Sequence, residues 1–261
     1  MPFEQSLPVA LSPSRLQDFQ SCPRRFQYAS IERRRQPATY ATAKGTFVHS
    51  IFEHLFALPP EQRTEDAARS FIPVAQEEVL VEPLVTEIAL DDGLLAKLLH
   101  DTDLIITRYF EMEDPRNVRT EGVELRVSET VDGVPLLGIL DRLDRDPDGS
   151  LVVIDYKTGA LPNRDYDAKT FANAEIYAAL CEAHLAERPS RIRLLYVSHG
   201  QAIERTVTAP VLAARRKSAV DAWTKITTYY EAGEFPATPS KNSCRFCAYK
   251  DLCRENGVAV P

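Results

Sequence analysis

Four cysteines near the two ends of the chain constrain its fold more than any other sequence feature. Cys22 stands alone near the start, whereas Cys244, Cys247 and Cys253 form a C-x2-C-x5-C triplet near the end. If all four thiolates bind one metal centre, that centre joins the two ends of the chain. The segment 236–261 has little apolar surface to bury, so we predict that such bonds order it.

The spacing of these cysteines leaves three interpretations open. With 26% charged residues, no signal peptide and no apolar run long enough to cross a bilayer, we predict a cytoplasmic protein with reduced thiols and no membrane partner. Structural zinc sites more often pair two C-x2-C motifs, whereas a triplet completed by one distant cysteine suits a 4Fe-4S iron-sulfur cluster. The spacing favours the cluster over zinc and over unliganded cysteines. Cys181 is interpreted as a buried apolar residue.

Composition sets the size and the surface of the protein. The chain has 261 residues, 44% of them hydrophobic, which is enough for one large domain over residues 1–261. The net charge of −7 does not by itself suggest a nucleic-acid-binding protein. Compact basic groups such as Arg24 and Arg25 are present, although such groups more often form a solvated face.

Helical periodicity precedes and follows a series of strands. We predict helices over residues 14–21, 45–58, 65–81, 94–112, 169–187 and 211–230, and strands over residues 119–130, 136–145, 151–157, 191–198 and 202–207. Residues 59–115 are predicted to form a helical insertion before the sheet. Because Asp132-Gly133 supplies a tight hairpin turn, the first three strands are expected to be sequential and antiparallel.

Candidate catalytic residues lie on the second and third predicted strands. Side chains alternate along a strand, so Asp155 and Lys157 project to the same side. The turn near Asp148 places Asp141 roughly opposite Asp155. Unpaired carboxylates beside apolar strands are costly, so we predict a divalent cation, Mg²⁺ or Mn²⁺, with Lys157 left to stabilise negative charge. A surface salt-bridge network of the same residues is the alternative.

His49 is a candidate nitrogen ligand for this cation. It lies with Glu53 at the edge of the apolar stripe of the predicted helix 45–58, where a side chain can face a site. An imidazole ligand would favour Mn²⁺ over strict Mg²⁺ selectivity. The alternative is a boundary histidine without a ligand.

Together these motifs resemble the PD-(D/E)XK nuclease superfamily. The resemblance is greatest to its RecB/AddB-like iron-sulfur nucleases, which include the CRISPR-adaptation exonucleases. It rests on LSPSRLQDF (11–19), CPRRFQY (22–28), GTFVH (45–49), GILD (138–141), VVIDYKTG (152–159) and EIY (175–177), enclosed by the cysteines. It implies an α/β fold with a restriction-endonuclease-like central mixed sheet flanked by helices, and a 4Fe-4S cluster joining the termini. The implied activity is metal-dependent exonuclease hydrolysis of phosphodiester bonds in DNA, single-stranded by preference, in repair or recombination.

The resemblance also implies roles for individual residues. Residues matching His49, Asp141, Asp155 and the backbone carbonyl of Tyr156 hold the divalent metal in the family, and Lys157 matches the catalytic lysine. The four cysteines match the cluster ligands.

The family's Gln-x3-Tyr motif is only partly present. Tyr177 matches its tyrosine, whereas Asn173, one methylene shorter, stands where glutamine is usual. Both are candidate substrate-binding residues, and Arg24 and Arg25 are candidates for contacts with DNA phosphates.

Two other classes of function remain open. One is a non-catalytic DNA-binding module that docks to a helicase partner, and the other is a zinc-stapled protein of unrelated function. The chain contains no G-x4-G-K-[ST] loop. Any ATP-driven unwinding would therefore come from a separate helicase or repair-complex partner.

Overall fold

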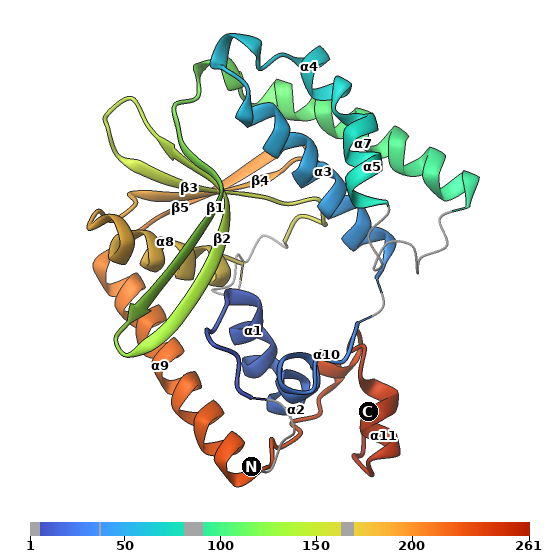
Figure 1. Ribbon diagram of the computed structural model, residues 1–261, viewed down its shortest axis with the longest axis vertical. Coiled ribbons are helices and arrows are strands. Elements are labelled where there is room, and N and C mark those ends of the chain that lie inside the picture. The colour runs from blue at the N-terminus through green and yellow to red at the C-terminus, as the bar shows by residue number, and fades with distance from the viewer. Residues whose placement is uncertain (1–5, 37, 81–90, 163–169) are drawn as a thin grey trace.

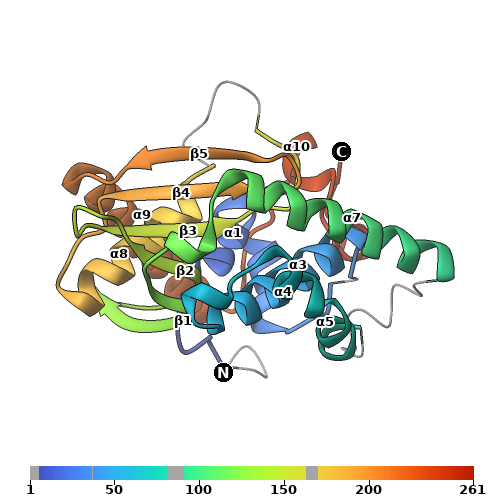
Figure 2. The same cartoon turned by 90° about the horizontal axis from the view of Figure 1, so that it is seen from above.

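A five-stranded mixed β-sheet lies at the centre of the computed structural model, which describes residues 6–36, 38–80, 91–162 and 170–261 (Figure 1). The strands are β1 (Thr120–Val131), β2 (Val134–Arg145), β3 (Leu151–Tyr156), β4 (Arg191–Tyr196) and β5 (Gln201–Thr206). They lie side by side in chain order, as Figure 2 shows. Only β3 and β4 pair in parallel, so the predicted antiparallel arrangement of the first three strands is confirmed.

Local sequence explains the two central features of the sheet. Asp132 and Gly133 have φ angles of 49° and 80°, which is the left-handed backbone that a two-residue hairpin turn requires. Every residue of β3 is buried, because helices cover both faces of the sheet at this strand.

Two groups of helices cover the two faces of the sheet (Figure 1). One face packs against α1 (Pro13–Ser21), α2 (Pro23–Phe26), α8 (Ala172–Leu185) and α9 (Ala209–Ala232). The other face packs against α3 (Tyr40–Ala57), α4 (Glu65–Ser70), α5 (Ile72–Val79) and α7 (Asp92–Met112). The shorter elements are η1 (Gln27–Ile31), η2 (Pro60–Gln62), η3 (Pro115–Asn117), α10 (Lys241–Cys244) and α11 (Lys250–Glu255).

Three predicted helices have different bounds in the structure. The helix predicted over 65–80 is divided into α4 and α5, because Pro73 in the first turn of α5 cannot continue the preceding helix. Helix α3 starts five residues earlier than predicted, since Thr39 and Thr42 form a capping box. Residues 81 and 169, where two predicted helices end and begin, lie outside the described residues.

The N-terminal and C-terminal segments contact each other directly. Arg24 N donates a hydrogen bond to the carbonyl of Pro236 at 3.2 Å, and the rings of Tyr28 and Tyr249 lie 5.5 Å apart. The Tyr249 hydroxyl also donates to the carbonyl of Arg34. Within the described residues, no helix combines the length and the apolar character needed to cross a membrane.

Candidate active site

Strands β2 and β3 bring two aspartates and a lysine together. Arg142 pairs with Ile154 in the sheet register, so the next residues along the two strands, Asp141 and Asp155, are neighbours. Lys157 Nζ lies 2.5 Å from Asp155 Oδ2 in an ion pair that is largely shielded from solvent. Burial would lower the pKa of Lys157, but the Asp155 carboxylate outweighs it and holds the pKa above the ordinary value. Lys157 is therefore a cation near neutral pH.

His49 of α3 faces the same carboxylates from a helix that packs on the sheet. Its Nδ1 lies 3.5 Å from Asp141 Oδ1, and its Nε2 lies 3.2 Å from the carbonyl oxygen of Tyr156. In the tautomer that donates from Nε2 to this carbonyl, the Nδ1 lone pair points toward the carboxylates. The Tyr156 amide in turn donates to Asp141 Oδ2 at 2.7 Å. The Tyr156 backbone thus orients both His49 and Asp141.

Glu124 of β1 completes this group, and the sequence motifs did not point to it. One ligand atom each from His49, Glu124 and Asp141 lie within 4.8 Å of one another. Glu124 lies directly across from Asp141, between Val123, which pairs with Arg142, and Leu125. A symmetry argument would have found it, since Glu124 and Asp141 are equally distant from the Asp132-Gly133 turn. Strand alternation alone places Glu124 only on the polar side of β1.

The carboxylates of this group are electrostatically unfavourable in the absence of a cation. Burial, followed by the charge of Asp155, raises the pKa of Asp141 to about 6. Burial, followed by the charge of Asp141, raises the pKa of Glu124 to about 7. A divalent cation would relieve both effects, and carboxylate oxygens with one imidazole nitrogen are ligands that suit Mn²⁺ and Mg²⁺. His49, Glu124 and Asp141 are therefore the residues that would hold it, with Asp155 adjacent.

These raised pKa values predict a pH-dependent response to metal. Since both folded-state pKa values exceed the ordinary value near 4, the two carboxyls favour folding at acid pH and lose that contribution as pH rises through 6 to 7. Mn²⁺ binds the deprotonated carboxylates, so its affinity is expected to fall about tenfold or more per pH unit below pH 6. Differential scanning fluorimetry should show a large rise in Tm with Mn²⁺ at pH 7.5 and little at pH 5. An equal rise at both pH values would contradict this assignment.

Tyr177 of α8 borders the same group. A Cβ atom on Gly138 of β2 would lie 2.7 Å from the Tyr177 ring, so only glycine allows this helix to approach the sheet so closely. Burial and the charge of Asp155 raise the pKa of Tyr177 above its ordinary value. Its hydroxyl therefore remains neutral and available as a hydrogen-bond donor.

A buried arginine supports the site from the other face of the sheet. Arg142 is fully buried and donates to the Tyr156 hydroxyl and to Glu113, both at 2.7 Å. It also pairs with Asp144 at 2.8 Å. Because Arg142 anchors the side chain of Tyr156, it holds in place the backbone that orients His49 and Asp141.

Three predicted substrate-binding residues lie elsewhere. Asn173 donates from its amide to Gln17 of α1 at 3.3 Å. Arg24 pairs with Glu234 at 3.6 Å, and Arg25 pairs with Asp18 at 2.7 Å. The structure places these residues beside α1 and α2 and does not join them to the group around Asp141.

The four predicted cluster cysteines lie around one small cavity between the two terminal segments. Burial and then the nearby thiols of Cys22, Cys247 and Cys244 raise the pKa of Cys253. The backbone amide of Thr238 points to Cys22 Sγ at 3.4 Å. Cys181, by contrast, is fully buried in the core, and burial raises its pKa to about 12.

Comparison with known proteins agrees with this site. A family model described as the PD-(D/E)XK nuclease superfamily matches residues 10–254. Three strains of Streptococcus agalactiae have an ATP-dependent helicase/deoxyribonuclease one of whose subunits is 29% identical over 131 residues. That match covers 49% of this chain and 12% of each relative.

Among solved structures, a crystal structure named "Putative exonuclease" from Eubacterium rectale has a similar fold. The TM-score is 0.58 at 13% sequence identity, and the match covers 97% of this chain and 90% of that chain. The similarity includes the five-stranded sheet and its flanking helices, and at this identity it shows the fold alone. Because the family model spans nearly all of the sequence, the chain belongs to the PD-(D/E)XK nuclease superfamily.

Proposed function

We propose that the protein is a metal-dependent exonuclease that hydrolyses phosphodiester bonds of single-stranded DNA. The observation that carries this proposal is the convergence of His49, Glu124 and Asp141 within 4.8 Å, beside the Asp155–Lys157 ion pair. Such a group offers anionic ligands for a cation and one fixed positive charge. Both are complementary to a phosphodiester whose charge increases during hydrolysis.

Each residue has a distinct part in the proposed reaction. A bound divalent cation would supply Lewis-acid stabilisation of the phosphate and activation of water. Lys157, held by Asp155, stabilises the charge that develops on the phosphate oxygens. His49 is held in its tautomer by the Tyr156 carbonyl, and the neutral Tyr177 hydroxyl can donate to a substrate oxygen.

The activity is tested with the purified protein and two forms of single-stranded DNA. End-labelled linear DNA and circular DNA are incubated with Mn²⁺, with Mg²⁺ or with EDTA. We expect the linear strand to be shortened from an end, the circle to survive, and EDTA to stop the reaction. Cleavage of the circle would indicate an endonuclease. Binding without cleavage of either form would instead support a non-catalytic DNA-binding module.

We further propose that Cys22, Cys244, Cys247 and Cys253 hold a 4Fe-4S cluster. Zinc–sulfur bonds of about 2.3 Å place the sulfurs of a zinc tetrahedron roughly 3.8 Å apart. Although all four cysteines are among the described residues, no three of their sulfurs lie within 4.8 Å of one another. This wider spacing around a shared cavity supports a larger inorganic centre over zinc.

Metal analysis distinguishes the two centres. Anaerobically purified protein is expected to contain about four iron and four sulfide per chain, as a 4Fe-4S centre requires, and Cys253→Ser is expected to lose most of both. Cys181→Ala is the matched control, because the fifth cysteine lies in the core away from this cavity, and it should retain iron and sulfide. One equivalent of zinc without sulfide would overturn the cluster assignment.

A helicase partner in DNA repair or recombination is also proposed. Support comes from the similarity to the streptococcal helicase/deoxyribonuclease, although the match covers 12% of that relative. Because the chain contains no nucleotide-binding P-loop, the partner would supply ATP-driven unwinding. Co-purification of the tagged protein with an ATPase that stimulates digestion of duplex DNA would support this. Equal duplex digestion with and without ATP would argue against it.

A further inference from the structure

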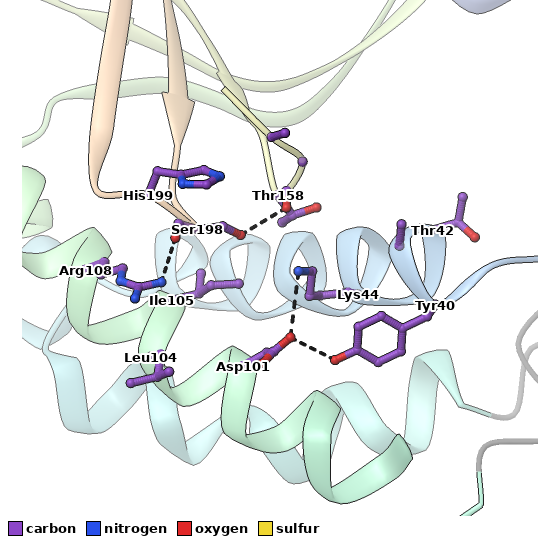
Figure 3. A pocket seen from close by; sticks show the side chains of 13 residues that line it. Tyr40, Thr42, Lys44, Asp101, Leu104, Ile105, Arg108, Thr158, Ser198 and His199 are labelled. Carbon is purple, nitrogen blue, oxygen red and sulfur yellow. Dashed lines mark hydrogen bonds and ion pairs between the residues drawn. The ribbon is translucent and has the colours of Figure 1, made fainter. Parts of the chain in front are cut away.

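A second cavity of about 580 Å³ adjoins the active site (Figure 3). It lies between the first turns of α3, the middle of α7 and the loops that follow β3 and β4. Its polar lining includes Lys44, Arg108, Thr158, Ser198 and His199. The mechanism above uses none of these residues.

The two cavities share the same part of α3 and the same end of β3. Gly45 lines the active-site cavity, while its neighbour Lys44 lines the second one. Thr158, which lines the second cavity, directly follows the catalytic Lys157. A Cβ atom on Gly45 would lie 3.5 Å from Thr158 Oγ1, and one on Gly159 would meet nothing within 4 Å. The ridge between the cavities therefore carries no side chain at Gly45 or Gly159.

A glycine inside α3 lowers helix stability. Relative to alanine, the loss is about 1 kcal/mol. Such a glycine commonly marks a place where another backbone or a ligand approaches closely. At Gly45, the low ridge would let an extended chain pass from one cavity into the other.

The two cavities have opposite charge. The active-site cavity is lined by Glu53, Glu78 and Glu124. The second cavity presents Lys44, whose only ion pair within the described residues is a long one of 3.8 Å to Asp101. A protein with a net charge of −7 thus places cations next to its metal ligands.

Arg108 adds unused hydrogen-bonding capacity. It donates one hydrogen bond, from Nη1 to the carbonyl of Ser198 at 2.6 Å, and its other N–H groups have no partner in the described part of the chain. In Figure 3 the Lys44, Arg108 and Thr158 side chains line the same space. Guanidinium, ammonium and hydroxyl donors together are well suited to phosphate.

The rest of the lining suits a nucleobase. The Tyr40 ring lies 5.0 Å from Lys97 Nζ, and its hydroxyl donates to Asp101 at 3.0 Å, which fixes the ring at the edge of the cavity. Leu104 is 39% exposed and forms an apolar wall. Aromatic and apolar faces beside cations are the usual platform for single-stranded nucleic acid, and the volume is in the range of small-ligand sites.

We propose that this cavity binds the nucleotide that adjoins the scissile phosphodiester of the DNA strand. Its phosphate contacts Lys44, Arg108 and Thr158, and its base lies against Tyr40 and Leu104. The strand crosses the ridge at Gly45, with the scissile phosphate beside Lys157. This inference rests on the proposed nuclease function and defines the part of the substrate that the second cavity recognises.

The test measures single-stranded DNA binding and cleavage with Lys44→Ala/Arg108→Ala. We expect KM to rise at least about tenfold, since two charged contacts are lost. Without metal, the slope of log affinity against log salt should fall by about 1.4, or about 0.7 per phosphate contact. Lys44→Ala alone leaves the Arg108 bond to the loop intact, so a fall of about 0.7 is expected even if the double variant folds poorly. Lys217→Ala/Arg119→Ala, which removes two exposed cations elsewhere, is the control.

A competition experiment identifies which end of the strand enters. Deoxynucleoside 5′-monophosphate and 3′-monophosphate are titrated against labelled DNA, and the stronger competitor in wild-type protein should lose its advantage in Lys44→Ala. If wild-type protein cleaves DNA while both variants keep the wild-type KM and salt slope, the cavity assignment is wrong and the nuclease assignment stands. If wild-type protein cleaves no DNA with Mn²⁺, the proposed function itself fails.

Discussion

Lys157→Met is expected to lower the rate of DNA cleavage by about 10²–10³-fold. The side chain of methionine has similar length but no charge, so the phosphate oxygens lose the cation that Asp155 holds in place. Asp155→Asn is expected to lower the rate by a similar factor, because the amide no longer holds Lys157 by charge. Single-turnover cleavage of end-labelled DNA, with enzyme in excess, measures the chemical step.

Two controls make this result specific. Lys217→Met removes an exposed lysine of α9 that pairs with Asp221, and it should cleave at the wild-type rate. Lys157→Met should also keep the wild-type Tm and bind Mn²⁺, since Lys157 is not a metal ligand. A variant that cleaves within about threefold of wild type would place the chemistry elsewhere, because one lost charge-stabilising group costs far more.

Arg142→Met is expected to lower the free energy of unfolding by about 3–5 kcal/mol. The guanidinium is fully buried, and its removal leaves Glu113 and Asp144 without their cation in a low-dielectric environment. The Tyr156 hydroxyl also loses a hydrogen-bond donor. Urea unfolding followed by circular dichroism measures the change.

Arg116→Met provides the matched comparison. Its pair with Asp114 is exposed, with 56% of the Arg116 side chain accessible, so a change of about 0–1 kcal/mol is expected. Adding Glu113→Gln to Arg142→Met should restore part of the lost stability, since one uncompensated charge disappears. A loss below about 1 kcal/mol in Arg142→Met would mean that the network around Tyr156 does not support the site.

Local patterns were sufficient to predict the core of the site. The hairpin at Asp132-Gly133 and the turn near Asp148 set the register of β1, β2 and β3 within a short stretch of chain. Short turns leave little freedom in pairing, so the proximity of Asp141 and Asp155 followed from counting. The same counting applies to Glu124, but strand alternation alone does not distinguish a solvated glutamate from a ligand.

Tertiary contacts determined what the sequence could not predict. Whether His49 faces a site or solvent depends on how α3 packs against β3, and periodicity places it only at the edge of the apolar stripe. The contact of Asn173 with Gln17 joins α8 to α1 across most of the chain, and no local pattern reports such a contact. The division of α4 from α5 was foreseeable from Pro73, although the helical periodicity continues across it.

Binding of Mn²⁺ to the wild-type protein and to Asp141→Asn is the most direct test of the central claim. Isothermal titration calorimetry at pH 7.5 should detect Mn²⁺ binding in wild-type protein that is weakened at least about 100-fold in Asp141→Asn, since a ligand is lost at the middle of the group. Asp221→Asn, at an exposed aspartate of α9, should bind as wild type does. Equal Mn²⁺ affinity in the wild-type and Asp141→Asn proteins would contradict the metal site on which the proposed nuclease function depends.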